Sequence, residues 1–182
     1  SSNTMDNYPE TLEAWICLYL TPKRGYFAPD YKTSEGYYLQ MPPVRDFDYK
    51  NREELIAILE EAFRVGNPPM EAPTETPEGS LVMSAAGYNS ASELEKNTLP
   101  ISIEKLTTCY ELRYPERLPN GRWDKRNFAL SCSVPLDLGC PGVADAILEY
   151  LKPWYKVSSV EIEQRWADGS TFYSVFLQKA NR

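Results

Sequence analysis

Alternating carboxylates are the side chains in this 182-residue sequence with the clearest capacity for chemistry. Asp46 and Asp48 form one such pair, and Glu161 and Glu163 form another. Two acids held at a set separation across a sugar can hydrolyse a glycosidic bond. Alternating acids are more typical of a solvated strand edge. A carbohydrate-acting enzyme is therefore an alternative hypothesis, and it requires that two of these acids share an enclosed pocket.

The chain contains no histidine, which removes most other acid–base and nucleophilic chemistry. Serine triads and cysteine–histidine dyads use histidine as the general base, and most zinc hydrolases use it as a ligand. The cysteines lack CxxC spacing, so we expect no metal site and a reduced, cytoplasmic protein. Neither a dinucleotide-binding glycine motif nor a P-loop is present, so we expect no cofactor. These observations favour a protein that is not an enzyme. The four cysteines are Cys17, Cys109, Cys132 and Cys140.

The acidic balance of the chain favours a protein partner over nucleic acid. The net charge is -7 and the isoelectric point is about 4.8, whereas phosphate binding needs clustered Lys and Arg. Residues 51–80 contain seven glutamates and two arginines, a local charge of -5. Acidity usually serves solubility, but it would also steer a basic partner to this face. A nucleic-acid-mimic anti-restriction protein is a second alternative, with acids spaced along an elongated surface. The acids that we predict to contact a partner are Glu60, Glu61, Glu71 and Glu75.

Tyrosine is the second candidate contact residue, with 13 copies in the chain. It is a frequent interface anchor because it offers a large contact area with few torsions to order. The alternative interpretation is that about half of these rings alternate into the sheet core. Tyr37 and Tyr38 join the predicted contact residues. The tyrosines gathered near the start of the chain are Tyr26, Tyr31, Tyr37, Tyr38 and Tyr49.

The first half of the chain, residues 10–66, reads as strands followed by a helix. The helix is predicted over 51–65, with Asn51 and Glu54 as a capping box and Gly66 as its end. Its apolar stripe fits a 3.6-residue period. A proline pair ends the third strand because proline has no amide hydrogen to donate. The stripe residues are Leu55, Ile56, Leu59, Ala62 and Phe63, and the strands are 13–20, 26–27 and 37–41.

The second half, residues 81–151, has a similar order. A short helix starts after Ser90, with Glu93 completing a capping box, and strands follow. The pair Asn120–Gly121 predicts a hairpin with a type I′ turn. A helix is predicted over 141–151. The strands are 99–103, 107–114 and 127–134, and the helix stripe is Val143, Ala144, Ile147, Leu148 and Leu151.

These patterns predict an α+β (α/β) fold, with antiparallel strand meanders covered by helices. We expect one domain over residues 5–182, built from two similar halves. The proline- and glutamate-rich residues 67–80 would form a linker or long surface loop between them. A terminal β-hairpin is predicted over 158–178, with a two-residue turn at Asp168–Gly169 that pairs Val160 with Leu177. No apolar run approaches the roughly 20 residues that span a bilayer, so no membrane association is expected.

Two segments resemble the immunity proteins of bacterial contact-dependent growth inhibition and related polymorphic toxin systems. They are "AWICLYLTPKRGYFAPDYKTSEGYYLQMPPVRDFDYKNREELIAILEEAFRVGNPP" and "LVMSAAGYNSASELEKNTLPISIEK", which together cover most of residues 13–106. The likeness rests on a strand, a Gly–aromatic turn, a helix with its Gly-x-Pro stop and the "AAGYNSASELEK" segment, none of which is a catalytic signature. It implies a cytoplasmic protein, a monomer or weak homodimer, that binds and neutralises a cognate toxin domain, often a nuclease.

Overall fold

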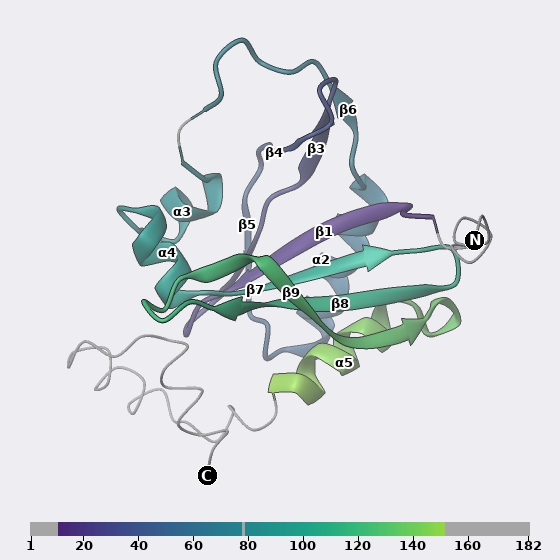
Figure 1. The fold of residues 1–182 in the computed structure, drawn as a ribbon. Helices are drawn as coiled ribbons and strands as arrows, with labels where there is room; N and C mark the ends of the chain where they lie inside the picture. Colours follow the sequence, from purple (N-terminus) through teal and green to yellow (C-terminus); the bar gives the residue numbers. More distant parts are fainter. Residues whose placement is uncertain (1–10, 78, 152–182) are drawn as a thin grey trace, which may run out of the picture.

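The computed structural model describes residues 11–77 and 79–151 and has the predicted α+β architecture (Figure 1). A large sheet has the order β5-β2-β1-β7-β8-β9, with antiparallel neighbours throughout. A small sheet has the order β4-β3-β6. The strands are β1 (Ala14–Leu20), β2 (Gly25–Phe27), β3 (Asp30–Thr33), β4 (Tyr38–Gln40), β5 (Arg45–Phe47), β6 (Pro69–Met70), β7 (Leu99–Lys105), β8 (Cys109–Arg117) and β9 (Trp123–Pro135). The helices are α2 (Arg52–Val65), α3 (Leu81–Ala85), α4 (Ala91–Asn97) and α5 (Gly139–Leu151), with a 3-10 turn η1 (Leu136–Leu138).

One face of the large sheet carries the main core. Alternation along β1 directs Ile16, Leu18 and Leu20 to this inner face, because successive side chains of a strand point to opposite sides. The inner face packs against α2 and α5, which supply the buried residues Leu55, Ile58, Leu59, Ala62, Val143, Ala144, Ile147 and Leu151. The two helix stripes are therefore close to those predicted, except that Ile58 is buried while Ile56, Phe63 and Leu148 are only partly buried.

The opposite, outer face of β1 meets the small sheet. The Trp15 ring lies 5.0 Å from that of Tyr38 on β4, and Gln40 donates to the Tyr19 hydroxyl at 3.1 Å. A second, smaller core forms on this side under α3 and α4, around Ala28, Val82 and Leu94. α2 and α5 thus cover one side of the large sheet, α3 and α4 lie on the other side, and the small sheet projects beyond the large sheet (Figure 1).

The strand order contains the same succession twice. β1, β2 and β5 are consecutive neighbours and are followed by α2, and β7, β8 and β9 are consecutive neighbours followed by α5. β1 pairs with β7 at the centre of the sheet, with Cys17 opposite Ser102. Both helices cover the inner face because each has an apolar stripe to bury. The superposition of the two halves stays a prediction.

The residues after α2 are fixed to two strands where they begin. Asn67 accepts from the Trp15 amide and donates through its side chain to the carbonyls of Trp15 and Asp30, all at 2.8–2.9 Å. Pro69 and Met70 form β6, which pairs in parallel with β3. The composition suggested loose packing, but one asparagine amide satisfies the backbone of two strands here.

Other local predictions differ in detail from the structure. Asn51 caps α2 as predicted, but Glu54 accepts from the Asp48 amide rather than completing the box. Glu93 likewise bonds to the amide of Asn89 rather than to that of Ser90. The β8–β9 turn is not type I′, since no described residue other than glycine has a positive φ. Gly121 has φ 86° and donates to Leu118, so Pro119 and Asn120 form a type I turn followed by a left-handed glycine.

Several further elements were absent from the sequence prediction. These are β3, β5, β6 and α3, all of which are two to five residues long and too short for a periodic pattern. The final helix begins at Gly139, two residues before the predicted start, and β9 begins at Trp123 rather than 127.

The predicted hairpin over 158–178 lies outside the described residues. Among the described residues, no helix is long and apolar enough to cross a membrane. None of the four cysteines is in a disulfide.

Candidate binding site

The four predicted contact acids do not form one face. Glu60 and Glu61 lie on α2, behind the large sheet in Figure 1, whereas Glu71 and Glu75 follow β6 at the far end of the small sheet. Glu61 is also committed to an ion pair, with its Oε1 3.2 Å from Nε of Arg45. The acidic run is continuous in sequence but divided in space, because the chain leaves the helix through Gly66 and enters another sheet.

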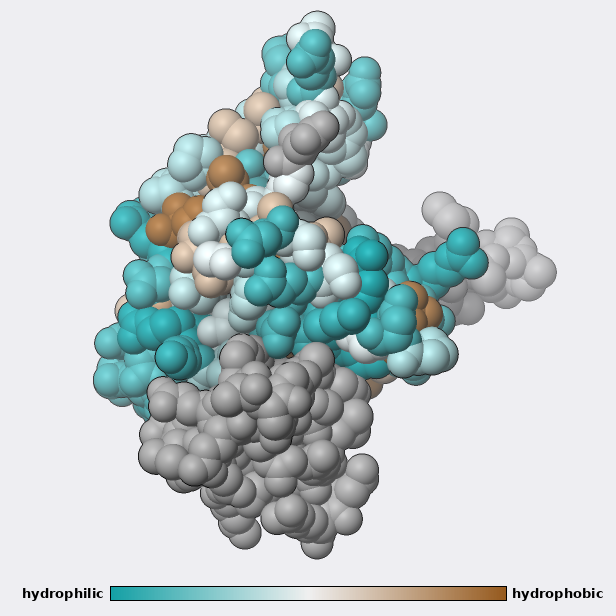
Figure 2. All heavy atoms as spheres, turned by 90° about the vertical axis from the view of Figure 1, so that its left-hand side faces the viewer, coloured by the Kyte–Doolittle hydropathy of each residue, from teal (hydrophilic) through white to brown (hydrophobic). Residues whose placement is uncertain are grey.

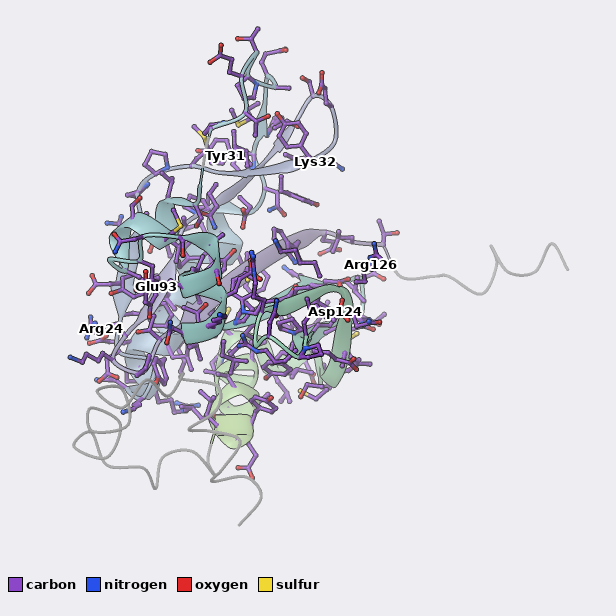
Figure 3. The ribbon with its side chains drawn as sticks, turned by 60° about the vertical axis from the view of Figure 1, so that its left-hand side comes forward. Arg24, Tyr31, Lys32, Glu93, Asp124 and Arg126 are labelled. Atoms are coloured by element: carbon purple, nitrogen blue, oxygen red, sulfur yellow. The ribbon has the colours of Figure 1, made fainter. Side chains whose placement is uncertain are left out.

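The predicted tyrosines have different environments. Tyr38 packs against Trp15, and the Tyr37 carbonyl accepts from the Thr33 amide and hydroxyl at the turn between β3 and β4. Both rings are partly buried, so they stay candidates for contact. Tyr49 is 1% exposed and belongs to the core, which agrees with the alternative interpretation for part of this group. Tyr31 lies on the small sheet with Lys32 (Figure 3).

The carboxylates of the enzyme hypothesis are not assembled in the described part of the chain. Asp46 is exposed on β5 and pairs with Arg24 at 3.1 Å, while Asp48 accepts from the Lys50 amide. Glu161 and Glu163 lie outside the described residues. In residues 11–77 and 79–151, no group of three or more Cys, Asp or Glu side chains is placed to hold a metal ion.

The end of the β8–β9 hairpin, residues 114–127, is a feature that the sequence analysis did not single out. We call it the arm. β7 pairs with β8 only as far as Arg113, so the arm extends beyond the β7–β8 ladder. Glu95 of α4, only 3% exposed, holds the arm through Arg122, Lys125 and the Trp123 amide. The Arg122 Nη2 atom lies 2.8 Å from the Glu95 carboxylate and Lys125 Nζ lies 3.4 Å from it.

These contacts set the charge state of Glu95. Desolvation acts to raise its pKa, but the hydrogen bond from Arg122 and the charges of Lys125 and Arg122 outweigh desolvation and lower the pKa below its ordinary value. Glu95 therefore remains a carboxylate at neutral pH. A buried carboxylate fixes the positions of the groups that donate to it, because loss of any one donor would leave part of its negative charge unpaired.

Arg117 and Trp123 tie the arm to the backbone. The guanidinium of Arg117 donates to the carbonyls of Glu95, Gly121 and Thr98, the last at 2.6 Å. The indole of Trp123 also donates to Thr98, at 3.2 Å. Side chains thus replace the missing ladder between the arm and the start of β7.

A shallow hollow of about 520 Å³ lies along the arm. It is lined by Glu95, Leu118, Arg122, Trp123, Asp124, Lys125, Arg126 and Asn127. A second hollow of about 440 Å³ lies between β3 and β6 and includes Lys32, Asn67 and Glu71. Figure 2 presents a largely hydrophilic surface, with the small sheet rising as a lobe above it. In Figure 3 the small sheet with Lys32 and the arm with Arg126 lie at separate corners of the molecule.

Asp30 is a second buried acid, at the junction of β1 and the small sheet. It is 5% exposed, and its Oδ2 has no hydrogen-bond partner in the described residues. Burial raises the pKa of this carboxyl to about 7. Burial also raises the pKa of the neighbouring Cys17 thiol and Tyr19 hydroxyl, and Asp30 adds to both shifts. A thiol with a raised pKa is a poor nucleophile, so this cluster has no activated group.

The arm could have been identified from its local positive charge, which the negative charge of the whole chain outweighs. Residues 114–127 have four cationic and two anionic side chains, a net charge of +2, while the rest of the chain carries -9. A local charge opposite to that of the whole chain marks a distinct surface. The role of Glu95 had no such signal, because its burial depends on a hairpin that approaches from 20 or more residues away.

Comparison with known proteins gives a likeness of fold. No protein-family model and no curated protein sequence matches the chain. Among solved structures, a protein of unknown function from Neisseria meningitidis is similar with a TM-score of 0.50 and 13% sequence identity, covering 74% of this chain and 90% of that protein. At this identity the likeness concerns the fold alone, which supports the mixed α+β assignment.

Proposed function

We propose that the protein is an immunity protein that binds a cognate bacterial toxin domain in the cytoplasm and neutralises it as a stoichiometric inhibitor. The observation that carries the proposal is the arm, a cationic surface segment that is held in place by the buried Glu95 and by Arg117. A surface ordered before binding loses little conformational entropy when a partner docks. The resemblance of residues 13–106 to immunity proteins supplies the class of partner.

The shape of the surface supports a macromolecular partner. Small-molecule sites are concave and mostly apolar, and they enclose most of the ligand. Both hollows here are shallow and bordered by charged side chains such as Lys125 and Glu71. Protein interfaces, in contrast, are enriched in Arg, Tyr and Trp with a polar rim. Trp123, Arg122 and the partly buried Tyr38 fit that description.

The charge of the chain supports a basic toxin domain, as a nuclease would be. An enzyme that binds nucleic acid needs clustered cations. The -9 charge outside the arm would attract such a domain from a distance and speed association, while it would repel nucleic acid. The long-range field thus selects the partner, and specific contacts then hold it.

The test is protection and binding with one defined probe, the C-terminal domain of the protein encoded directly upstream of this gene. Co-expression should restore growth of cells that produce this domain, and the purified proteins should form a 1:1 complex in calorimetry. A toxin domain from an unrelated system is the control and should not bind. Loss of growth despite co-expression, together with no complex, would reject the immunity hypothesis.

The acids predicted from the sequence can be tested in their two spatial groups. Glu60→Lys with Glu61→Lys changes α2, and Glu71→Lys with Glu75→Lys changes the segment after β6. We expect each pair to slow association with the same probe by about threefold to tenfold at low salt and to reduce the salt dependence, because rim charges act mainly on the association rate. Association rates measured at 20 and 300 mM salt check this. Unchanged rates in both variants would reject these four acids as steering residues.

A further inference from the structure

We infer that the arm docks against a patch of carboxylates on the toxin domain, with Lys125 and Arg126 as the cations that pair with them. The inference rests on the proposed function and adds the contact surface and the chemistry of its partner. It concerns residues that are distinct from the acids predicted to steer association. The overall acidity of the chain gives no indication of such a contact, because the cations are concentrated in one short segment.

Lys125 and Arg126 lie in a bulge of the β8–β9 ladder. Pro115 lies opposite Phe128, and the next pair along the hairpin is Glu116 with Asp124, so residues 125–127 have no partner on β8. Proline cannot donate a ladder hydrogen bond, which allows the strand to separate at this point. Bulges of this kind redirect side chains, and they occur often beside functional sites. Lys125 and Arg126 are therefore adjacent in the bulge, and both are exposed.

Asp124 fixes the conformation of the bulge through two hydrogen bonds. Its Oδ1 accepts from the Arg126 amide at 3.0 Å and its Oδ2 accepts from the Asn127 side chain at 2.7 Å. These bonds lower the pKa of Asp124, so it is ionised at neutral pH. Its negative charge is thus used to hold the bulge. An ordered bulge presents its cations in one arrangement, which favours binding.

The surrounding charges leave the two cations available. Glu95 is shared by Arg122 and Lys125, but the side chain of Lys125 is still 68% exposed and can accommodate an outside carboxylate. Within the described residues no ion pair involves the Arg126 side chain. A guanidinium can bind a carboxylate through two parallel hydrogen bonds, so Arg126 adds geometric selectivity to the charge of Lys125.

The chemistry favours carboxylates of a protein over the phosphates of nucleic acid. Tight phosphate binding depends on many cations that together release counterions. The arm offers two exposed cations, and the remaining chain carries a charge of -9 that repels a polyanion. A basic protein with one compact acidic patch fits both the cationic arm and the acidic rest of this chain. Its carboxylates would pair with the arm, and its basic surfaces would be attracted to the acidic rest of the chain.

The experiment compares two variants that have the same net charge. Lys125→Glu with Arg126→Glu reverses the arm, whereas Lys32→Glu with Lys50→Glu reverses two exposed cations elsewhere. The probe is the upstream-encoded C-terminal domain used above. We expect the arm variant to bind at least tenfold more weakly than the wild type, and the matched control to remain within about threefold. Circular dichroism and urea unfolding confirm that each variant is folded.

Three outcomes would overturn the inference. If the wild type binds and protects but the arm variant binds equally well, the docking surface is wrong while the proposed function stands. If the wild type neither binds nor protects, both fail together. If a 20-base-pair DNA or a 20-nucleotide RNA binds tightly in fluorescence anisotropy and loses affinity on reversal of the arm, the class of partner is wrong. Restored binding of the arm variant to a probe with Lys in place of its exposed Asp or Glu residues would support the inference directly.

Discussion

Asp30 and Glu95 are two carboxyl groups that are buried almost equally, at 5% and 3% exposure, yet their pKa values move in opposite directions. Asp30 lies between the large and small sheets, and Glu95 lies between α4 and the arm. Desolvation disfavours the charged form of both groups. Glu95 has Arg122 and Lys125 beside it and remains ionised, whereas Asp30 faces Cys17 and Tyr19 and has no cationic partner within the part of the chain that the structure describes.

The difference shows how each outlying part is attached to the large sheet. The small sheet is held by neutral bonds, with the Asn67 amide joining β1 to β3 and Gln40 joining β4 to Tyr19. The arm is held by charges. Neutral contacts suit the dry junction of two sheets, since a charge there costs free energy without a partner. Ionic contacts suit the rim of the sheet, where long cationic side chains can reach both the carboxylate and water.

The largest expected effect is a pH dependence of stability caused by Asp30. Its pKa rises from 3.8 in the unfolded chain to about 7 in the folded protein. The folded state therefore holds a proton that the unfolded state has lost between these values, and stability falls as the pH rises from about 4 to about 7. One pKa unit corresponds to about 1.4 kcal/mol, so the total loss approaches about 4 kcal/mol.

Asp30→Asn removes this titration and keeps the shape of the side chain. Urea unfolding at several pH values from 5 to 8 should give a falling free energy of unfolding for the wild type and a flat one for the variant. The chain has no histidine to titrate in this window, which makes the comparison clean. Parallel pH profiles for the two proteins would contradict the raised pKa of Asp30.

The second effect is the loss of the anion that holds the arm. Glu95→Ala leaves Arg122, Lys125 and the Trp123 amide without their shared acceptor. Breaking a buried ion pair on one side typically costs about 3 to 5 kcal/mol. We expect about 3 kcal/mol here, because the hollow beside the arm admits water to the freed cations. Urea unfolding at pH 7 measures it.

Glu95→Gln is the matched control, because it keeps an acceptor for the Trp123 amide but removes the charge. It should lose less stability than Glu95→Ala. A loss below about 1 kcal/mol for Glu95→Ala would mean that the arm does not depend on its buried anion, and the contrast with Asp30 would then lose its basis.

The main layers of this fold could be predicted from the sequence because they depend on local periodicity. The stripes of α2 and α5 and the largely apolar runs of β1 and β7 are visible in single segments. The small sheet could not be predicted, since β6 has only two residues and pairs with a strand more than 30 positions earlier. The three bonds by which Asn67 joins β1 and β3 are likewise encoded by no periodic pattern.

The candidate site was harder to predict than the fold. The glutamates of residues 51–80 are close in sequence, but the chain turns at Gly66 and places Glu71 away from Glu60. The cations of the arm gather because the β8–β9 hairpin pairs Arg117 with Trp123, the residue that follows Arg122. Local charge could have identified this segment. The buried partner that orders it, Glu95, required the tertiary structure.

The smallest expected effect comes from an ion pair of similar chemistry at the surface. Arg24 and Asp46 approach to 3.1 Å, nearly the separation of Arg122 and Glu95, but their side chains are 41% and 63% exposed. Water solvates both groups when the pair is broken, so an exposed pair contributes little. Asp46→Ala should change the free energy of unfolding by less than about 0.5 kcal/mol. Urea unfolding of Asp46→Ala and Glu95→Ala, each at low and high salt, tests whether burial or distance determines how much an ion pair contributes to the free energy of unfolding. A loss for Asp46→Ala comparable to that for Glu95→Ala would show that distance alone decides it.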